Sequence, residues 1–218
     1  MLCHIKYMLY VKSYIKIHRH MIEFNSISKQ TPYLIFIDLY QKALNLEQKN
    51  IEAICIASYS PESSEVNARF VNLKFVNDNE FIFFSNYKSP KSQDFRSHQQ
   101  ITGLIYWNSI NVQVRIKAYI KKTNKEFNSS YFAKRDRRKN ALAISSDQSK
   151  TISSYTDVQK NFKRSLEKDN LTQCPEYWGG FSFTPYYFEF WEGHESRLNK
   201  RETYELQSNE WIHSLLQP

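Results

Sequence analysis

The stretch Gly180-Phe-Ser-Phe-Thr-Pro-Tyr-Tyr-Phe-Glu-Phe-Trp-Glu192 is dominated by aromatic side chains. Aromatic residues are enriched in β-strands, because they pack well on a pleated surface. We therefore expect a strand over residues 180–192, followed by shorter strands over 201–206 and 211–216. These strands are expected to form the C-terminal part of the fold.

Upstream of this stretch, β-rich runs with a period of two alternate with short turns. We expect one early helix, with Thr31 as its N-cap, Pro32 as its first residue and an end near Leu46. Strands meeting through short turns, with helices inserted, favour a closed antiparallel barrel of mainly β (α+β) class. The expected strands are 51–60, 68–76, 81–86, 101–107 and 112–123, and the further helices are 89–98, 125–135 and 156–168.

Composition excludes several kinds of site. The 218 residues carry 30 basic and 22 acidic side chains, for a formal charge of +8, and only four are glycine. Neither a G-x-G-x-x-G motif nor a phosphate-binding P-loop can be assembled from those four positions. A nucleotide cofactor must therefore be held by side chains. The three cysteines are widely spaced, so we expect no disulfide framework and no metal site.

The N-terminal twenty residues mix apolar and basic residues without a usable pattern. Lys6, Lys12 and Lys16 interrupt every apolar run, and no later run reaches eighteen apolar residues. We therefore expect a cytoplasmic protein with no membrane partner. Residues 1–30 are expected to be a tail or a mis-called extension, with translation starting at Met1 or Met21, and residues 31–218 a single domain.

Separated polar clusters stand at strand ends and in loops. The densest basic run is Lys134-Arg135-Asp136-Arg137-Arg138-Lys139, which suits an anionic partner such as a phosphorylated small molecule or a nucleic acid. The aromatic residues fall largely at core-like strand positions, which disfavours nucleic acid. The other clusters are Arg69–Lys74, Phe84–Lys91, Gln113, Tyr131–Arg135, Gln148-Ser149, Trp178–Phe181, Phe190-Trp191 and Arg197–Arg201.

In this order and spacing the clusters resemble the pyridoxine/pyridoxamine 5′-phosphate oxidase family, from about residue 31 to the C-terminus. The most specific part is Trp178-Gly-Gly-Phe181, followed by Glu189-Phe190-Trp191 and by Arg197-Leu198 with Arg201. The resemblance implies an FMN-binding split β-barrel, usually a homodimer with FMN across the interface. It implies oxidation of pyridoxamine or pyridoxine 5′-phosphate to pyridoxal 5′-phosphate, with dioxygen as acceptor.

The resemblance also implies roles for individual residues. Gln148 and Ser149 correspond to a pair near the FMN of the partner subunit. Arg69 and Lys74 point to opposite faces of one strand unless a bulge intervenes. The residues that match FMN-binding positions are Arg69, Phe70, Val71, Asn72, Leu73, Lys74, Phe84, Ser85, Lys91, Gln113, Gln148, Ser149, Trp191 and Arg201.

For the substrate, Arg197 matches the catalytic arginine placed over the vitamer at the flavin face. Lys74, Tyr131 and Arg135 match further substrate contacts. Tyr131 and Arg135 are four residues apart on one helix, so both can face one ligand. Trp178, Phe181 and Phe183 are interpreted as core.

The chain departs from the family pattern around the substrate. Lys139 stands where the family has a serine, and Asn199 where it has a histidine. Pro90 and Leu215 replace arginines, and the N-terminal arginine–tyrosine lid motif has no counterpart in residues 1–29. Two alternatives therefore stay open. One is a divergent split-barrel flavoenzyme with another substrate, and the other is a non-catalytic protein that binds FMN or a vitamer phosphate.

Overall fold

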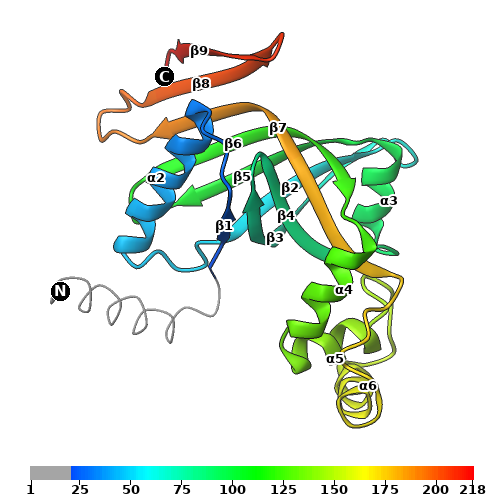
Figure 1. Cartoon of the computed structure of the whole chain (residues 1–218). Coiled ribbons are helices and arrows are strands. Elements are labelled where there is room, and N and C mark those ends of the chain that lie inside the picture. Colours follow the sequence, from blue (N-terminus) through cyan, green and yellow to red (C-terminus); the bar gives the residue numbers. More distant parts are fainter. Residues whose placement is uncertain (1–20) are drawn as a thin grey trace, which may run out of the picture.

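The computed structural model describes residues 21–218, and the expectations about residues 1–20 lie outside that part of the chain. Six of its strands form a closed ring, in the order β3-β2-β5-β6-β7-β4 and back to β3 (Figure 1). All six neighbouring pairs are antiparallel. The ring strands are β2 (Ala53–Ser60), β3 (Glu65–Asn77), β4 (Glu80–Asn86), β5 (Gln100–Trp107), β6 (Val112–Lys122) and β7 (Trp178–Glu192).

Three further strands extend this ring. β7 continues outward to β8 (Lys200–Gln207) and β9 (Glu210–Leu216), and β1 (Glu23–Asn25) pairs in parallel with β3. The mainly β split-barrel fold with flanking helices is therefore confirmed. The sequence pattern did not reveal β1. Because β1 pairs in the sheet and Ile22 lies in the core, the fold includes residues before the expected boundary at residue 31.

Five helices accompany the strands in the described part of the chain. α2 (Thr31–Asn45) packs on the ring through Tyr33, Phe36 and Tyr40, and α3 (Pro90–Ser97) follows β4. α4 (Lys125–Lys134), α5 (Arg137–Ser145) and α6 (Tyr155–Lys168) lie together beyond one end of the ring (Figure 1). No helix in residues 21–218 combines the length and apolar character of a membrane span.

Two expectations about the helices need correction. The N-cap of α2 is Gln30, which has extended backbone angles, so Thr31 is already helical and Thr31 is not the cap. α5 was not predicted. It buries only Asn140 and Ala141, so its sequence lacks the apolar stripe by which a helix is recognised.

The barrel interior is filled by side chains from opposite strands. Phe81 and Phe83 of β4 lie opposite Phe183 and Phe181 of β7, all fully or almost fully buried. The rings of the two pairs are stacked. Such aromatic pairs stabilise the core by more than the burial of their apolar surface alone would. Trp178, Phe181 and Phe183 are all buried, as the sequence analysis expects.

Close approach of β4, β7 and α4 depends on a glycine pair. Asn128 of α4 accepts a hydrogen bond from the backbone N–H of Gly180 (2.8 Å), and Tyr87 donates to the carbonyl of Gly180 (3.0 Å). A Cβ atom on Gly180 would lie 2.5 Å from Thr123 Oγ1, far inside van der Waals contact. The small residue therefore lets α4 dock on the sheet, and α4 carries part of the candidate site.

Candidate active site

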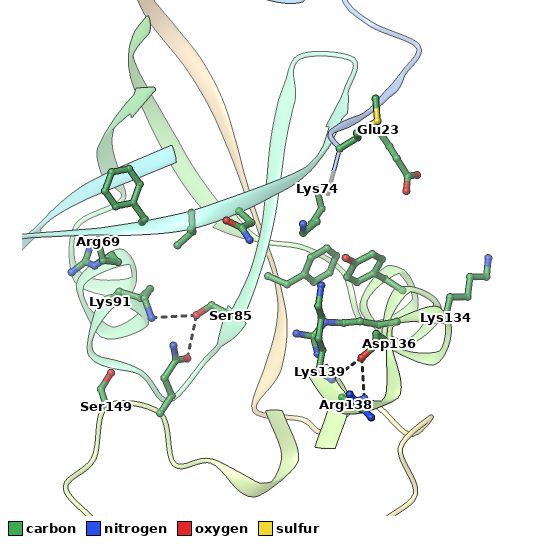
Figure 2. A pocket seen from close by; sticks show the side chains of 18 of the residues that line it. Glu23, Arg69, Lys74, Ser85, Lys91, Lys134, Asp136, Arg138, Lys139 and Ser149 are labelled. Atoms are coloured by element: carbon green, nitrogen blue, oxygen red, sulfur yellow. Dashed lines mark hydrogen bonds between the residues drawn. The ribbon is translucent and has the colours of Figure 1, made fainter. Parts of the chain in front are cut away.

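A cavity of about 1180 Å³ opens between β3, β4, the start of α3 and the α4–α5 corner (Figure 2). Most of the clusters singled out in the sequence meet there, although they span eighty residues of the chain. The lining side chains belong to Met21, Glu23, Arg69, Phe70, Val71, Asn72, Lys74, Phe84, Ser85, Pro90, Lys91, Tyr131, Lys134, Arg135, Asp136, Arg138, Lys139, Gln148 and Ser149.

Arg69 lies in the middle of β3 and is held by the neighbouring strand. Its Nη1 donates to Ser58 Oγ (2.7 Å) and to the carbonyl of Ile56 (3.3 Å), and its Nη2 lies 3.6 Å from Asp94 Oδ2. Burial lowers the pKa of the guanidinium, and the charge of Asp94 opposes that shift. An arginine stays protonated at any pH of interest, so Arg69 presents a fixed positive charge to the cavity.

Lys91 is a buried cation at the start of α3. Its ammonium group donates to Ser85 Oγ and Ser89 Oγ, both at 3.3 Å, and its side chain is nearly inaccessible. Burial lowers its pKa, and so does the positive charge of Arg69, while Asp94 acts in the opposite direction. Two cations this close repel each other, so an anion bound between them would be stabilised by both.

Lys74 enters the same cavity because β3 is irregular. Residues 69 and 74 differ by an odd number and would face opposite sides of a regular strand. The β3–β4 register shifts between Leu73 and Phe75, so the bulge turns Lys74 toward the cavity. Leu73 is buried in the core instead, and its side chain does not reach the cavity.

A second cationic group surrounds Lys74. Burial lowers the pKa of Lys74 and the charge of Glu52 opposes that shift, while the positive charges of Lys139 in the first turn of α5 and of Arg135 at the end of α4 lower it further. Asp136 caps α5 by accepting hydrogen bonds from the N–H groups of Arg138 (3.0 Å) and Lys139 (3.2 Å). The cap fixes the corner between the helices, where Arg135 and Lys139 both line the cavity. Figure 2 shows Asp136, Arg138 and Lys139 at this corner.

An aromatic stack forms part of the cavity wall. The rings of Phe84 and Tyr131 lie 4.0 Å apart at 12°, and the parallel ring of Trp178 lies 5.1 Å from that of Phe84. Burial raises the pKa of Tyr131, so its hydroxyl remains a neutral donor. The cavity wall at this point is therefore flat, apolar and rigid.

Gln148 and Ser149 join the cavity from the segment between α5 and α6. Gln148 Oε1 accepts from Ser85 Oγ (3.5 Å) and from the backbone N–H of Asn86 (3.4 Å). The structure therefore brings this pair to the cavity of its own chain, beside Ser85. Its expected proximity to the FMN of a partner subunit stays a prediction.

Besides Leu73, five expected site residues lie elsewhere. Gln113, Trp191 and Arg201 form a row across β6, β7 and β8, and Arg201 donates to the buried carboxylate of Glu189 at 2.8 and 3.0 Å. Trp191 is thirteen residues along β7 from Trp178, about 40 Å at the rise of an extended strand. Arg197 and Asn199 lie between β7 and β8, where Asn199 accepts a hydrogen bond from the N–H of His194. None of the five lines the cavity.

Sequence reasoning missed several lining residues. Lys134, Asp136 and Arg138 belong to the basic run that the sequence singles out, so that run held the signal. Glu23 reaches the cavity only because β1 pairs with β3, and a three-residue strand leaves no readable periodicity. It brings a carboxylate into a cavity lined mainly by cations.

Known proteins resemble this chain over most of its length. Residues 178–218 match the family model "Pyridoxine 5′-phosphate oxidase C-terminal dimerisation region". Pyridoxine/pyridoxamine 5′-phosphate oxidase 1 of Hydrogenovibrio crunogenus is 32% identical over 176 residues, covering 80% of this chain and 81% of that protein. Pyridoxine/pyridoxamine 5′-phosphate oxidase of Acaryochloris marina is 33% identical over 190 residues, covering 86% of both chains.

Solved structures share the fold. PhzG from Burkholderia lata 383, in complex with tetrahydrophenazine-1-carboxylic acid, superposes with a TM-score of 0.82 at 21% identity, over 87% of this chain and 93% of that one. A pyridoxamine 5′-phosphate oxidase-related, FMN-binding protein from Nostoc punctiforme gives a TM-score of 0.72 at 12% identity, over 87% and 100% of the two chains. At these identities the likeness concerns the fold alone.

The closed ring of strands with its cationic side cavity defines a split-barrel protein with a site for anionic ligands. The curated relatives narrow the assignment to one family, because about one third of their residues are identical to those of this chain and the match covers most of both chains. The chain belongs to the pyridoxine/pyridoxamine 5′-phosphate oxidase family, a family of FMN-dependent oxidoreductases.

Proposed function

We propose that the protein oxidises pyridoxamine or pyridoxine 5′-phosphate to pyridoxal 5′-phosphate. The observation that carries this proposal is the pair of cationic groups in one cavity, Arg69 with Lys91 and Lys74 with Arg135 and Lys139. Two phosphorylated molecules, the cofactor and the substrate, need two such groups. When bound, FMN supplies the two-electron oxidation of the vitamer and passes the electrons to dioxygen, which gives hydrogen peroxide.

Arg69 and Lys91 fit the phosphate of FMN. Lys91 is buried beside another cation, and its Nζ donates only to hydroxyl groups within residues 21–218. A phosphate dianion would restore charge balance there through charge-assisted hydrogen bonds. Pro90 at the first position of α3 leaves no N–H of its own to satisfy, and the positive end of the helix dipole also favours an anion.

The other cationic group suits the phosphate of the substrate. Tyr131 and Arg135 project from one face of α4, and Lys74 and Lys139 approach from β3 and α5. The flat stack of Phe84 and Tyr131, which lines the same cavity, offers an apolar wall to an aromatic ring. These residues bind and orient the substrate, and none of them has to remove a proton in this role.

The residues that lie outside the cavity favour a site shared by two subunits. A second copy of the chain must supply Gln113, Trp191 and Arg201 if these residues are to reach a ligand in the cavity. Arg197 and Asn199 come directly after β7, the strand that carries Trp191. The C-terminal region that carries Trp191 and Arg201 matches a model described as a dimerisation region. In this arrangement Arg197 of the second copy would lie over the substrate at the flavin.

A subunit-mixing experiment tests the shared site. Arg69→Ala and Arg201→Ala should each be nearly inactive. When the two variants are unfolded and refolded together, about one quarter of all sites should combine an intact cavity with an intact row, because symmetric dimers pair at random. Recovery of activity supports the shared site, whereas a mixture as inactive as its components, or an active monomer in light scattering, contradicts it.

Oxygen consumption tests the reaction itself. The FMN-loaded protein should consume oxygen on addition of pyridoxamine 5′-phosphate and form pyridoxal 5′-phosphate in equal amount. A yellow protein without oxygen uptake would indicate a non-catalytic binding protein. Uptake with other phosphorylated aromatic substrates but not with B6 vitamers would indicate the divergent flavoenzyme, which the replacements Lys139 and Asn199 also suit.

A further inference from the structure

The guanidinium group of Arg135 is held in place by neutral partners. Its Nη1 donates to Asn140 Oδ1 (2.9 Å), and its central carbon lies 5.1 Å from the ring centroid of Trp178. Within residues 21–218 no carboxylate lies within ion-pair distance of Arg135. Burial lowers the pKa of Arg135, and the electrostatic effects of Tyr131 and Asp136 oppose that shift.

The amide of Asn140 can point in only one direction. The residue is 1% exposed, and its Nδ2 donates to the carbonyls of Phe132 and Leu171, both at 2.8 Å. Both amide hydrogens are used, so the Oδ1 atom must face Arg135. Turning the amide over would set its NH₂ group against the guanidinium and its oxygen against two carbonyls. Asn140 is therefore a fixed acceptor for Arg135.

Trp178 provides the second contact and belongs to the aromatic stack of the cavity wall. Its ring is parallel to those of Tyr131 (6° at 6.3 Å) and Phe84 (9° at 5.1 Å). An indole face attracts a guanidinium without neutralising it. The same buried ring thus orders Tyr131 and Arg135 relative to each other.

We propose that Asn140 and Trp178 are positioning residues, which hold Arg135 for the phosphate group of the substrate while leaving its charge unneutralised. A carboxylate in place of Asn140 would hold the guanidinium equally well but would compete with the phosphate for it. The inference rests on the proposed function in one respect, that Arg135 receives the substrate phosphate.

Inorganic phosphate, titrated into the FMN-loaded protein by calorimetry, tests the proposal without any turnover. Asn140→Ser removes the acceptor and should weaken phosphate binding about tenfold, the cost of losing the orientation of one charge-assisted hydrogen bond. Trp178→Phe keeps a stacked ring with a weaker cation–π attraction, and should weaken binding about two- to fivefold. The KM for pyridoxamine 5′-phosphate should rise in parallel, with kcat within about threefold of the wild type.

A matched control separates positioning from folding. Trp107 is a buried indole like Trp178, but its Nε1–H donates to the carbonyl of Ile51 (3.0 Å) and its ring packs against Phe36 and Tyr40, and none of these contacts involves Arg135. Trp107→Phe should lower the melting temperature about as much as the two test variants do, but leave phosphate affinity unchanged. In an Arg135→Ala background, Asn140→Ser should have no further effect on phosphate affinity.

The proposal is overturned if Asn140→Ser and Trp178→Phe bind phosphate as the wild type does, or if the effect of Asn140→Ser persists in the Arg135→Ala background. Absence of phosphate binding by the wild-type FMN-loaded protein also overturns it. If phosphate binds as expected but B6 vitamers cause no oxygen uptake, the proposed reaction fails and the positioning of Arg135 stands.

Discussion

At the residue scale, the site depends on cations that carry little local neutralisation. Lys91 is the sharpest case, because its ammonium group is buried, donates only to Ser85 and Ser89 within the described residues, and has its pKa lowered by burial and by Arg69. A protein tolerates such a group when a ligand supplies the missing negative charge. Perturbed cations in a cavity are therefore evidence for an anionic ligand.

Lys91→Ala should weaken FMN binding about ten- to a hundredfold, because a charge-assisted hydrogen bond contributes on the order of 1.5–3 kcal/mol. Dilution followed by flavin fluorescence measures the loss. Lys88→Ala is the matched control, since Lys88 is exposed, lies over the Tyr177 ring and does not line the cavity. Equal FMN retention by both variants would remove Lys91 from the flavin site.

Asn199 predicts a flat pH profile. An amide does not titrate near neutral pH, so kcat/KM for pyridoxamine 5′-phosphate should vary little between about pH 5.5 and 7.5, and Asn199→His should introduce a titration near pH ~6.5. Parallel pH profiles of the two proteins measure this. Superimposable profiles would show that position 199 does not reach the reacting groups.

At the element scale, β6, β7 and β8 are joined by one buried carboxylate. Glu189 on β7 accepts hydrogen bonds from Arg115 on β6 and from Arg201 on β8, and these two partners hold its pKa below the ordinary value despite its burial. The network fixes the Arg201 side chain at the edge of the barrel where the row of Gln113 and Trp191 lies.

The Glu189 network makes stability depend on pH. A carboxylate with a lowered pKa in the folded state stabilises the protein above its unfolded pKa of about 4.3, and that stability is lost as the pH falls through the lower folded value. Glu189→Gln should lower the free energy of unfolding by about 2 kcal/mol at pH 7. The unfolding free energy of this variant, measured with urea, should fall less steeply toward pH 3 than that of the wild type.

Asp38→Asn is the control for this variant. Asp38 pairs with Lys42 one turn further along α2, and both side chains are exposed, so its loss should change stability by about 0.5 kcal/mol or less. Parallel pH dependence of Glu189→Gln and the wild type would contradict the role given to the network.

At the scale of the whole molecule, the cavity concentrates the excess positive charge of the chain. Seven lysines and arginines line it against two acidic residues, Glu23 and Asp136. A concave surface of one sign focuses its field and attracts ligands of the opposite sign from a distance. Part of the net charge of +8 therefore has a function at the cavity, where it attracts anionic ligands.

Salt should slow the capture of phosphorylated substrates. Raising the ionic strength from about 0.05 to 0.5 M shortens the screening length several-fold, so kcat/KM for pyridoxamine 5′-phosphate should fall with little change in kcat. Arg138→Ala removes one charge from the rim and should make the fall shallower. Arg137→Ala, a neighbour that does not line the cavity, should leave the slope as in the wild type. Equal slopes in all three proteins would rule out steering by the rim.

The sequence by itself determined eight of the nine described strands, four of the five described helices and the family. Each of these follows from a local pattern in the sequence. A period of two indicates a strand, an apolar stripe indicates a helix, and a run of residues in fixed spacing indicates the family. The extent of β7 follows from its own aromatic residues, and the residues of the cavity wall at 69–74, 84–91 and 131–139 stand in contiguous clusters.

The tertiary structure alone decided how these parts meet. It places Lys74 beside Arg135 through a bulge in β3, closes the ring by pairing β4 with both β3 and β7, and brings Glu23 into the cavity through a three-residue strand. It also separates Trp191 and Arg201 from the cavity of their own chain. These outcomes depend on pairings between residues far apart in the chain, whose free energy comes from packing and hydrogen bonds that no local pattern records.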